Sequence, residues 1–569
     1  MSILLASPAS YAPDTFDAIY YVRPGGPHGD SSGVGWANAF SDWAGIAFGT
    51  GAGQVGPNDL LCVDDILSST VQKTVTQGGT AATTALTIAG SQNSSCNDGS
   101  DSNSGTLRMT VAGSGAILKI SADYVTVRDI TIQGNGTGTV GADGIQTSTI
   151  GVAQTGIQIG PNVLVKNIND DGVAFNSTTP GGVEVDCNSL FGALDFTSCT
   201  YSLRVDTTRN DGIACGTPGI TVGKFQLFNT GRNTGGNTDG LAIYDRGSGS
   251  DCFGSTWKFF WIDKHQGPTY NSGSAAIDVQ VNGTPPEGLE TVTLTGGLIT
   301  RSARCVKNIA NGQVKVSGVV MQACEPSVVT YASSQTEYWN ITSYGGKMGF
   351  NQTESNTTSR TDLLKNSLVW GRDAWMGSTT DIMLSMYGNA LMTHTSDYNV
   401  YRDGGGGASD GSSFGYARST GTICQSKSVA PNGCPLATWK TQNPGFGSPW
   451  DQNSQEVETL PFVGGAELPD VNQTAAAATD LLTPTETNSV VRLTGGHLAR
   501  TAGTVPPAWV RDFCGNTYVD AGGGDYAVGA FEPSNTSCSV WTGVGDPPPP
   551  PVGPDKRSFG GSTATGGIW

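Results

Sequence analysis

The chain has 569 residues, a formal net charge of −18 and only 14% charged residues, and 81 of its residues are glycine. This excess of negative charge repels nucleic acids and anionic membranes, and it repels polyanionic glycans unless a divalent cation bridges them. Lys is scarce, whereas Ser, Thr, Asn, Val and Ile recur in short runs, which disfavours long helices and favours short strands joined by tight turns. Neutral glycans and proteins are therefore the expected partners.

The first residues, 1–19, lack periodicity and are predicted to form an N-terminal arm. Their apolar run at 3–6 is too short for a signal-peptide core and follows no basic segment, so we expect synthesis without such a signal. The first strand is predicted in "AIYYVRP" at 18–24. The segment "GWANAFSDW" from Gly35 leads towards a short capping helix, and "DLLCV" at 59–63 is expected to begin the first coil.

Short apolar strands then recur about every ten residues between 105 and 400, a pattern typical of a parallel β-helix. A β-sandwich is the alternative, but it rarely runs this long as one unit. Examples of the expected strands are "AILKI" at 116–120, "YVTVRDITI" at 124–132, "VLVKNI" at 163–168, "TVTLTGGLIT" at 291–300 and "VKVSGVVM" at 314–321.

The dipeptide Asp-Gly recurs at Asp143, Asp171, Asp211 and Asp239, with spacings of 28, 40 and 28 residues that suit one coil of a β-helix. Each glycine is expected to adopt a positive φ. In one interpretation these are recurring corners, and each carboxylate accepts a hydrogen bond from the backbone N–H two residues on.

In the other interpretation, stacked carboxylates of Asp171, Asp211 and Asp239 lie about 5 Å apart and supply the acid and the nucleophile of a glycosidase. Asp170 and Asp245 could then add oxygen ligands for calcium.

Aromatic residues are concentrated in "STWKFFWID" from Ser255. Trp257 and Trp261 are expected to face outward, where they could stack on sugar rings or on another subunit. The alternative places Phe259 and one of the two Trp residues in the core.

The cysteine count is even, and pairing neighbours along the chain would close six short loops. Disulfides in an oxidising setting and buried free thiols are both open, and the even count favours disulfides. No CxxC unit occurs, so no metal site is predicted from the cysteines. The cysteines are Cys62, Cys96, Cys187, Cys199, Cys215, Cys252, Cys305, Cys324, Cys424, Cys434, Cys514 and Cys538.

Towards the C-terminus, "RDGGGGASDGSS" from Arg402 indicates a loop, and the five prolines at 547–551 indicate an extended spacer. The last residues, ending in Ile568 and Trp569, form either a disordered extension or a docking peptide. The predicted organisation is an N-terminal arm (1–19), a β-helix body (20–400), C-terminal loops with final coils or a cap (401–540), and a Pro-rich linker with a tail (541–569).

Several segments together resemble the pectin-lyase-like class of right-handed parallel β-helix proteins: "YYV" and "WANAF" near the N-terminus, "SDYNVY" at 396–401 and "DFCGNTYVDAGGGDYAVGAFE" at 512–532. The resemblance spans roughly 18–532. It implies an all-β chain with a single right-handed parallel β-helix and short terminal arms, and it implies a trimer. The class includes lyases, hydrolases, adhesins and phage tailspikes, so the resemblance does not select an activity.

The evidence for catalysis is partial. "NTDGLAI" and "NDDGVAF" resemble two carboxylate motifs of polygalacturonase-type hydrolases, but their order is reversed, Gly172 replaces a Cys, and the Gly-His-Gly and Arg-x-Lys motifs are missing. A lyase needs a basic residue beside a calcium-bound uronate. Residues suited to this role only by type are Arg204, Arg209, Arg246 and Lys264, and the four scattered histidines are His28, His265, His394 and His497.

The leading hypothesis is therefore a structural protein of the bacteriophage virion surface: a capsid decoration protein, head fibre or tailspike. It would contact virion proteins through its terminal arms, could bind host-surface glycans, and would need no cofactor. The alternative is a polysaccharide lyase or glycoside hydrolase acting outside the cell, for which calcium is compatible.

Overall fold

The computed structural model describes most of the chain between residues 15 and 541. The described ranges are 15–25, 28–64, 66–69, 72–90, 95–96, 106–109, 115–135, 142–149, 151–188, 191–232, 238–244, 251–263, 274–281, 285–302, 304–309, 313–324, 328–330, 335–344, 348–352, 360–370, 382–387, 392–402, 413–418, 422–423, 436–441, 451–457, 483, 487, 501–522, 524–534 and 538–541.

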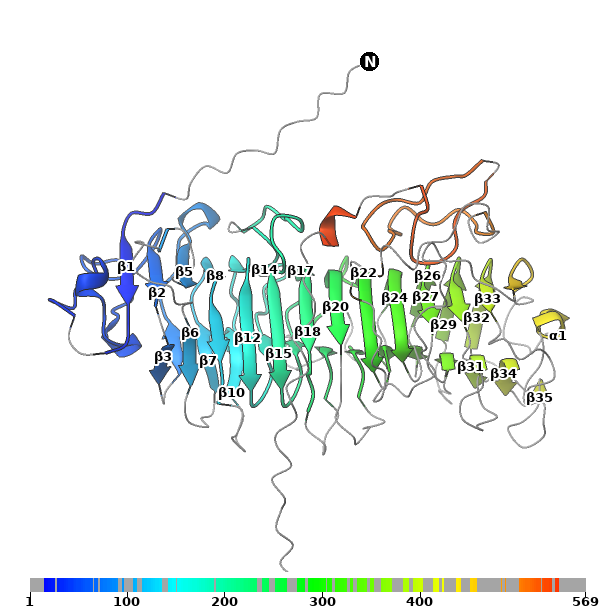
Figure 1. Ribbon diagram of the computed structural model, residues 1–569, viewed down its shortest axis with the longest axis horizontal. Helices are drawn as coiled ribbons and strands as arrows, with labels where there is room; N and C mark the ends of the chain where they lie inside the picture. Colours follow the sequence, from blue (N-terminus) through cyan, green and yellow to red (C-terminus); the bar gives the residue numbers. More distant parts are fainter. Residues whose placement is uncertain are drawn as a thin grey trace, which may run out of the picture.

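The described chain winds into a rod of stacked coils, and its strands form two long parallel sheets (Figure 1). Each strand pairs with its counterpart one coil away, as β12 (Val163–Ile168) pairs in parallel with β15 (Leu203–Thr208). Within the described residues, the only antiparallel pairing of two named strands joins β34 to β35. The predicted all-β fold, a right-handed parallel β-helix, is confirmed.

One sheet has 13 strands. They are β4 (Lys73–Val75), β7 (Gly115–Ile120), β10 (Ala142–Thr147), β13 (Val173–Phe175), β16 (Ile213–Cys215), β19 (Leu241–Tyr244), β21 (Ile277–Gln280), β23 (Val306–Asn308), β25 (Val328–Thr330), β28 (Met348–Gln352), β31 (Ile382–Tyr387), β34 (Ser413–Arg418) and β35 (Thr422–Ile423).

The other sheet has 23 strands. They are β1 (Ile19–Val22), β2 (Leu60–Val63), β3 (Ile66–Ser69), β5 (Leu86–Gly90), β6 (Thr106–Met109), β8 (Val125–Arg128), β9 (Thr131–Gln133), β11 (Ile157–Ile159), β12, β14 (Val183–Val185), β15, β17 (Thr221–Gly223), β18 (Phe225–Phe228), β20 (Thr256–Asp263), β22 (Thr291–Ser302), β24 (Gln313–Cys324), β26 (Gln335–Trp339), β27 (Thr342–Tyr344), β29 (Arg360–Lys365), β30 (Leu368–Trp370), β32 (Met392–Asp397), β33 (Val400–Arg402) and β36 (Gln455–Val457).

Helical structure in the described residues is short. It comprises α1 (Leu436–Thr441) and the 3-10 helices η1 (Trp36–Asn38), η2 (Trp43–Gly45), η3 (Ala82–Thr84) and η6 (Ser539–Trp541). The capping helix expected after Gly35 is thus a pair of single turns, η1 and η2. None of the described helices is long and apolar enough to cross a membrane.

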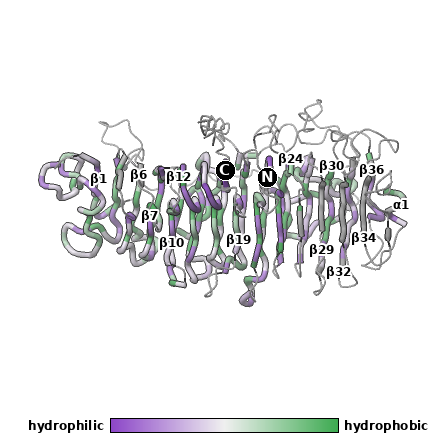
Figure 2. The backbone as a smooth tube through the Cα atoms, turned by 90° about the horizontal axis from the view of Figure 1, so that it is seen from below, coloured by the Kyte–Doolittle hydropathy of each residue, from purple (hydrophilic) through white to green (hydrophobic). Residues whose placement is uncertain are grey.

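The core is a continuous apolar column inside the coils that runs from Tyr20 to Tyr401 and on to Leu436. Strand alternation supplies it: in β16, Ile213 and Cys215 point inward into this column, and Ala214 between them points outward. Hydrophilic and hydrophobic residues accordingly alternate along the coils (Figure 2). Each fully buried aliphatic side chain contributes about 1.5–3 kcal/mol, so the column is the main source of stability.

A line of left-handed residues bends the chain within the 23-stranded sheet. Strand registers stack these residues in consecutive coils, and we call them the bend ladder. Asn and Gly adopt this conformation most readily, which explains much of the composition of the ladder. Its members are Lys224, Phe259, Gly296, Gly318, Asn340, Asn366 and Tyr398.

Residues 501–541, which we call the strap, run back along the outside of the rod over the bend ladder (Figure 1, orange to red). Asn340 Nδ2 donates to the carbonyl of Ala527 at 2.9 Å. Asn366 Nδ2 donates to Thr504 O at 2.6 Å, and Asn366 Oδ1 accepts from Thr504 N at 2.9 Å. At Gly318, with φ +61°, a Cβ would lie 2.4 Å from Arg511 O, so the strap needs glycine there.

The strap also covers an apolar row on the outer face of the 23-stranded sheet. This row includes Trp261, Leu298, Val320, Leu368 and Val400, each at most 3% exposed. The strap residues that pack on it include Phe513, Val528, Phe531 and Trp541. Burying such a row removes an apolar patch from water.

The segment 401–540 was predicted to hold C-terminal loops with final coils or a cap. In the structure, coil stacking continues past residue 400, because β33 pairs with β36 and β31 with β34. The 512–532 motif lies in the strap on the flank of the rod.

Five disulfides join cysteines that are neighbours in sequence, as the pairing of neighbours predicts. Cys424 and Cys434 lie outside the described residues. The bonds are Cys62–Cys96, Cys187–Cys199, Cys215–Cys252, Cys305–Cys324 and Cys514–Cys538.

The strap's attachment is testable at Asn366. Asn366→Ala removes both side-chain hydrogen bonds to Thr504, so we expect a loss of about 1–3 kcal/mol and faster proteolytic cleavage within 501–541. Asn162→Ala is the matched control, because Asn162 is also left-handed but is exposed, and its side chain donates to Asp129 rather than to the strap. Equal cleavage rates in the two variants would contradict the proposed attachment.

Candidate functional site

The carboxylates of Asp171, Asp211 and Asp239 stack at the turns that precede β13, β16 and β19, and we call them the acidic ladder. Asp211 N donates to Asp171 Oδ1 at 3.2 Å, and Asp239 N donates to Asp211 Oδ1 at 2.6 Å. Ala275 N donates to Asp239 Oδ1 at 2.6 Å. Each carboxylate thus receives a backbone N–H of the next coil.

These bonds support the structural interpretation of the ladder and correct its geometry. The expected acceptor bond was to the N–H two residues on in the same turn, whereas the bond found joins one coil to the next. The three carboxylates are 9%, 7% and 0% exposed. A buried backbone N–H without an acceptor costs about 1–3 kcal/mol, so each carboxylate satisfies a group that the turn would otherwise leave unpaired.

The glycines that follow are required for a different reason from the one predicted. The expected positive φ is wrong, because the four glycines of the Asp-Gly pairs have ordinary φ values. A Cβ would instead lie 2.4–2.6 Å from a carbonyl oxygen of the next coil, so close stacking excludes larger residues. The glycines are Gly144, Gly172, Gly212 and Gly240.

A second polar group lies beside Asp239 on the outer face of the 13-stranded sheet. Tyr244 donates from its hydroxyl to Asp239 Oδ2 at 2.7 Å. Asp278, paired with Ala242 in the neighbouring strand, accepts from Lys307 Nζ at 2.7 Å and from Gln280 Nε2 at 2.6 Å. Asp278 Oδ1 is buried and has no hydrogen-bond partner among the described residues.

Burial and the charge of Asp239 raise the pKa of Asp278, and Lys307 opposes this shift. Burial, followed by the charges of Asp211, Asp239 and Asp278, raises the pKa of Tyr244. In chemical terms, a carboxyl group with a raised pKa could donate a proton, and the Lys307 ammonium could neutralise an acidic group. However, Asp278 is 0% and Lys307 5% exposed, which keeps both from a polymer on the surface.

Calcium has one set of candidate ligands in the described chain. Carboxylate oxygens of Asp143, Asp170 and Asp171 lie within 4.8 Å of one another. They would supply three of the six to eight oxygens that calcium takes. Asp170 Oδ1 already accepts a hydrogen bond from Asn210 Nδ2. The other residue considered for calcium, Asp245, lies outside the described residues.

The aromatic residues singled out for glycan contact are covered. Trp257 was expected to face outward but is 0% exposed in the central column, where Nε1 donates to Ser255 Oγ at 2.9 Å. Trp261 does face outward, but the strap and an edge-on contact with Phe228 at 4.8 Å leave it 3% exposed. The alternation of β20 places these two on opposite faces because the left-handed Phe259 resets the pattern.

The basic candidates are dispersed. The Arg204 guanidinium lies over Phe228 at 4.9 Å and 3.9 Å from Asp206, and Arg209 is exposed. Arg246 and Lys264 lie outside the described residues, as do His265 and His497. His28 is half-buried, and His394 is buried in β32.

The sequence interpretation missed Asp278 and Tyr244. Asp278 has no Asp-Gly signal, because Ala276 occupies the place of the glycine in its coil. The position of Asp278 in the repeat could have identified it. The segment "AAIDVQV" is the next repeat of the strand that follows each Asp-Gly pair, and Asp278 stands at the outward-facing position that Ala242 occupies one coil earlier.

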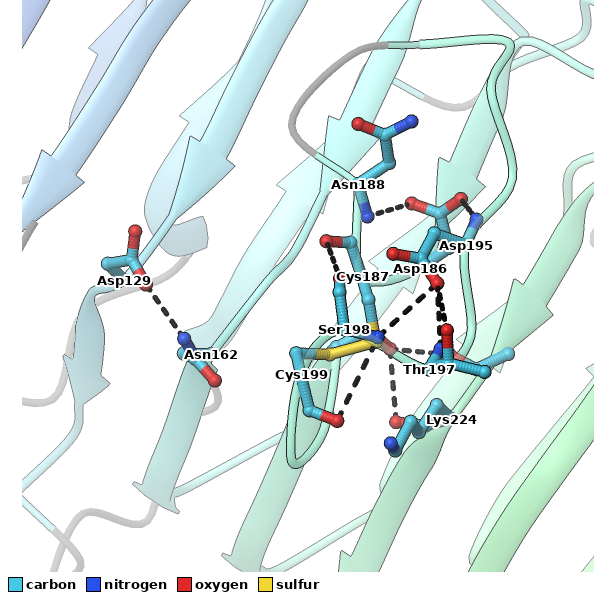
Figure 3. The surroundings of a disulfide bond; sticks show 12 residues. Asp129, Asn162, Asp186, Cys187, Asn188, Asp195, Thr197, Ser198, Cys199 and Lys224 are labelled. Atoms are coloured by element: carbon cyan, nitrogen blue, oxygen red, sulfur yellow. Dashed lines mark hydrogen bonds between the residues drawn. A yellow bond between two sulfur atoms is a disulfide. The ribbon is translucent and has the colours of Figure 1, made fainter. Parts of the chain in front are cut away.

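A further buried carboxylate, Asp186, organises the loop that the Cys187–Cys199 disulfide closes (Figure 3). Its Oδ1 accepts from Asn188 N at 2.9 Å and from Gln158 Nε2 at 2.6 Å, and its Oδ2 accepts from Asp195 N at 2.8 Å. Burial raises the pKa of Asp186 to about 6 in spite of these bonds.

Two substitutions at Asp239 separate a structural from a catalytic carboxylate. Asp239→Asn keeps an oxygen that can accept from Ala275 N, whereas Asp239→Ala leaves this buried N–H unpaired. We therefore expect Asp239→Ala to lose about 1–3 kcal/mol in urea unfolding and Asp239→Asn to lose clearly less. If both variants lose the same free energy of unfolding, the hydrogen bond to Ala275 N does not explain why a carboxylate is needed at this position.

Asp186 predicts a pH dependence. Its pKa is raised from 3.8 to about 6, so the folded chain holds a proton that the unfolded chain releases. The stability from this group is present at low pH and is lost as pH rises through about 6, by at most about 3 kcal/mol. In thermal unfolding, the stability of the wild type relative to Asp186→Asn should therefore decrease as the pH rises through about 6. A difference that grows as pH falls from 6 to 4 in favour of the variant would contradict the assignment.

Comparisons with known proteins add two distant structural likenesses. No protein-family model and no curated protein sequence matches the chain. The alginate lyase from Paenibacillus sp. str. FPU-7 is 14% identical, over 53% of this chain and 91% of that chain, with a TM-score of 0.26. Pectate lyase Pel9A is 13% identical, over 91% of this chain and 97% of that chain, with a TM-score of 0.36. The assignment of the fold therefore rests on the strand pairing of this chain itself.

Proposed function

We propose that this chain is a structural rod of a bacteriophage virion surface, such as a capsid decoration protein, head fibre or tailspike, which binds glycans without cleaving them. One observation carries the non-catalytic part. The three carboxylates best placed for hydrolysis are buried and accept backbone N–H bonds of the next coil. A glycosidase needs such groups beside an accessible scissile bond.

Further properties support a location outside a cell. Five disulfides suit an oxidising environment. The net charge of −18 disfavours nucleic acid and anionic membranes as partners. Attachment to virion proteins through the terminal arms, and assembly into trimers, are parts of the same proposal.

Cleavage of a polysaccharide is the second candidate, and one observation favours it. Asp278 has a raised pKa, lies 2.7 Å from Lys307 and is close enough to Asp239 to be affected by its charge. A carboxyl group beside a basic side chain is the minimum for a lyase or a hydrolase. This reading requires the region over Asp278 to open for a substrate.

The two candidates differ in their products. The full chain, incubated with alginate, polygalacturonate and neutral polysaccharides, with and without calcium, should yield neither reducing ends nor unsaturated uronates. Immunogold labelling of particles of the bacteriophage that encodes this chain should place the chain on the particle surface. Products that disappear in Asp278→Asn, with an unchanged melting temperature, would establish the enzyme instead. Absence of the chain from particles would remove the virion role.

A further inference from the structure

A polar hollow of about 500 Å³ lies between the last coils and the strap. This volume is within the usual range for sites of small ligands. The coils contribute Tyr398 and residues 452–455, α1 contributes Lys440, and the strap contributes 501–504 and 524–525. α1 and β33, the elements next to these residues, lie at the end of the rod away from β1 (Figure 1).

The bend ladder explains why the hollow forms at this coil. Lys365 pairs with Asp397 and Leu368 pairs with Val400, so Asn366 and Tyr398 occupy the same place in consecutive coils. Asn366 binds the strap at Thr504 through both side-chain atoms, and Asn340 binds it one coil earlier. At the next rung the amide is replaced by the half-buried ring of Tyr398, which lines the hollow.

The walls offer groups that suit hydroxyls. Lys440 Nζ is already used, since it donates to Ser454 O at 2.6 Å and to Gln452 O at 3.3 Å. Gln455 from the coils and Asp525 from the strap are both exposed and line the hollow. An amide can donate to and accept from a hydroxyl, and a carboxylate is a strong acceptor for hydroxyl groups.

The charge of the whole chain selects among sugars. Among the described residues, the hollow is lined by one cation, Lys440, and one anion, Asp525, but the chain carries −18, so a uronate polymer would be repelled. A neutral sugar avoids this repulsion. It can place an apolar ring face on Tyr398, since an aromatic ring combines an apolar face with a polar end.

We propose that this hollow is a binding site for a neutral oligosaccharide, with Tyr398 as the stacking platform and with Gln455 and Asp525 as hydrogen-bonding partners for its hydroxyls. The inference rests on the glycan-binding part of the proposed function and gives it a place and a substrate class.

The test uses the full chain, isothermal titration calorimetry, and hexasaccharides of glucose, mannose, galactose and N-acetylglucosamine as probes. Tyr398→Asn removes the ring and restores the amide that neighbouring rungs carry, in a residue that tolerates the left-handed conformation. We expect at least one probe to bind wild type, and Tyr398→Asn to weaken this binding about tenfold or more. Asp525→Asn should weaken it to a smaller extent.

Tyr124→Asn is the matched control, because Tyr124 is also left-handed and half-buried but lies in a coil near the N-terminal end. It should bind like wild type. If Tyr398→Asn also binds like wild type, the hollow is not the site, whereas the glycan-binding function stands. If wild type binds none of the probes at millimolar concentration, both the site and the binding of neutral glycans are excluded.

Discussion

The fold depends on hydrogen bonds that run between coils at the turns as well as along the strands. Parallel strands about 4.8 Å apart pair with one another, but the N–H groups of the turns have no strand partner. In three consecutive rungs an aspartate supplies the acceptor, and a glycine lets the next carbonyl approach. The same requirement that repeats the Asp-Gly pair along the sequence buries the carboxylates of Asp171, Asp211 and Asp239.

The strands, the spacing of the coils and the neighbouring disulfides could be predicted, because each depends on local patterns of apolar residues, turn residues and cysteines. The partner of each aspartate could not, since the same residue can cap its own turn or the next one. The role of Gly212 was likewise misassigned, because positive φ and close approach both select glycine.

The strap could not be predicted either, for a physical reason. Its partners, such as Leu298 and Leu368, are outward-facing apolar residues that look like ordinary strand residues until a second segment covers them. Trp257 and Trp261 illustrate the same difficulty. A left-handed residue at Phe259 shifts the alternation, so spacing alone does not say which Trp faces the core. In the candidate site, the Asp-Gly pattern does not predict Asp278, because its coil has Ala276 where the other coils have glycine.

Two polar regions of the rod differ in their properties. The group around Asp239, Asp278 and Lys307 is buried and holds its charges against one another. The hollow beside Tyr398 is open, its Lys440 ammonium group donates to backbone carbonyls, and Gln455 and Asp525 are exposed.

A crystal structure at atomic resolution, grown with calcium and a bound oligosaccharide, tests the central claim most directly. The account predicts that Asp171, Asp211 and Asp239 each keep one oxygen within hydrogen-bond distance of a backbone nitrogen in the next coil. It would be contradicted if these carboxylates turned away from the backbone to ligate an ion or to face the glycosidic bond of the sugar.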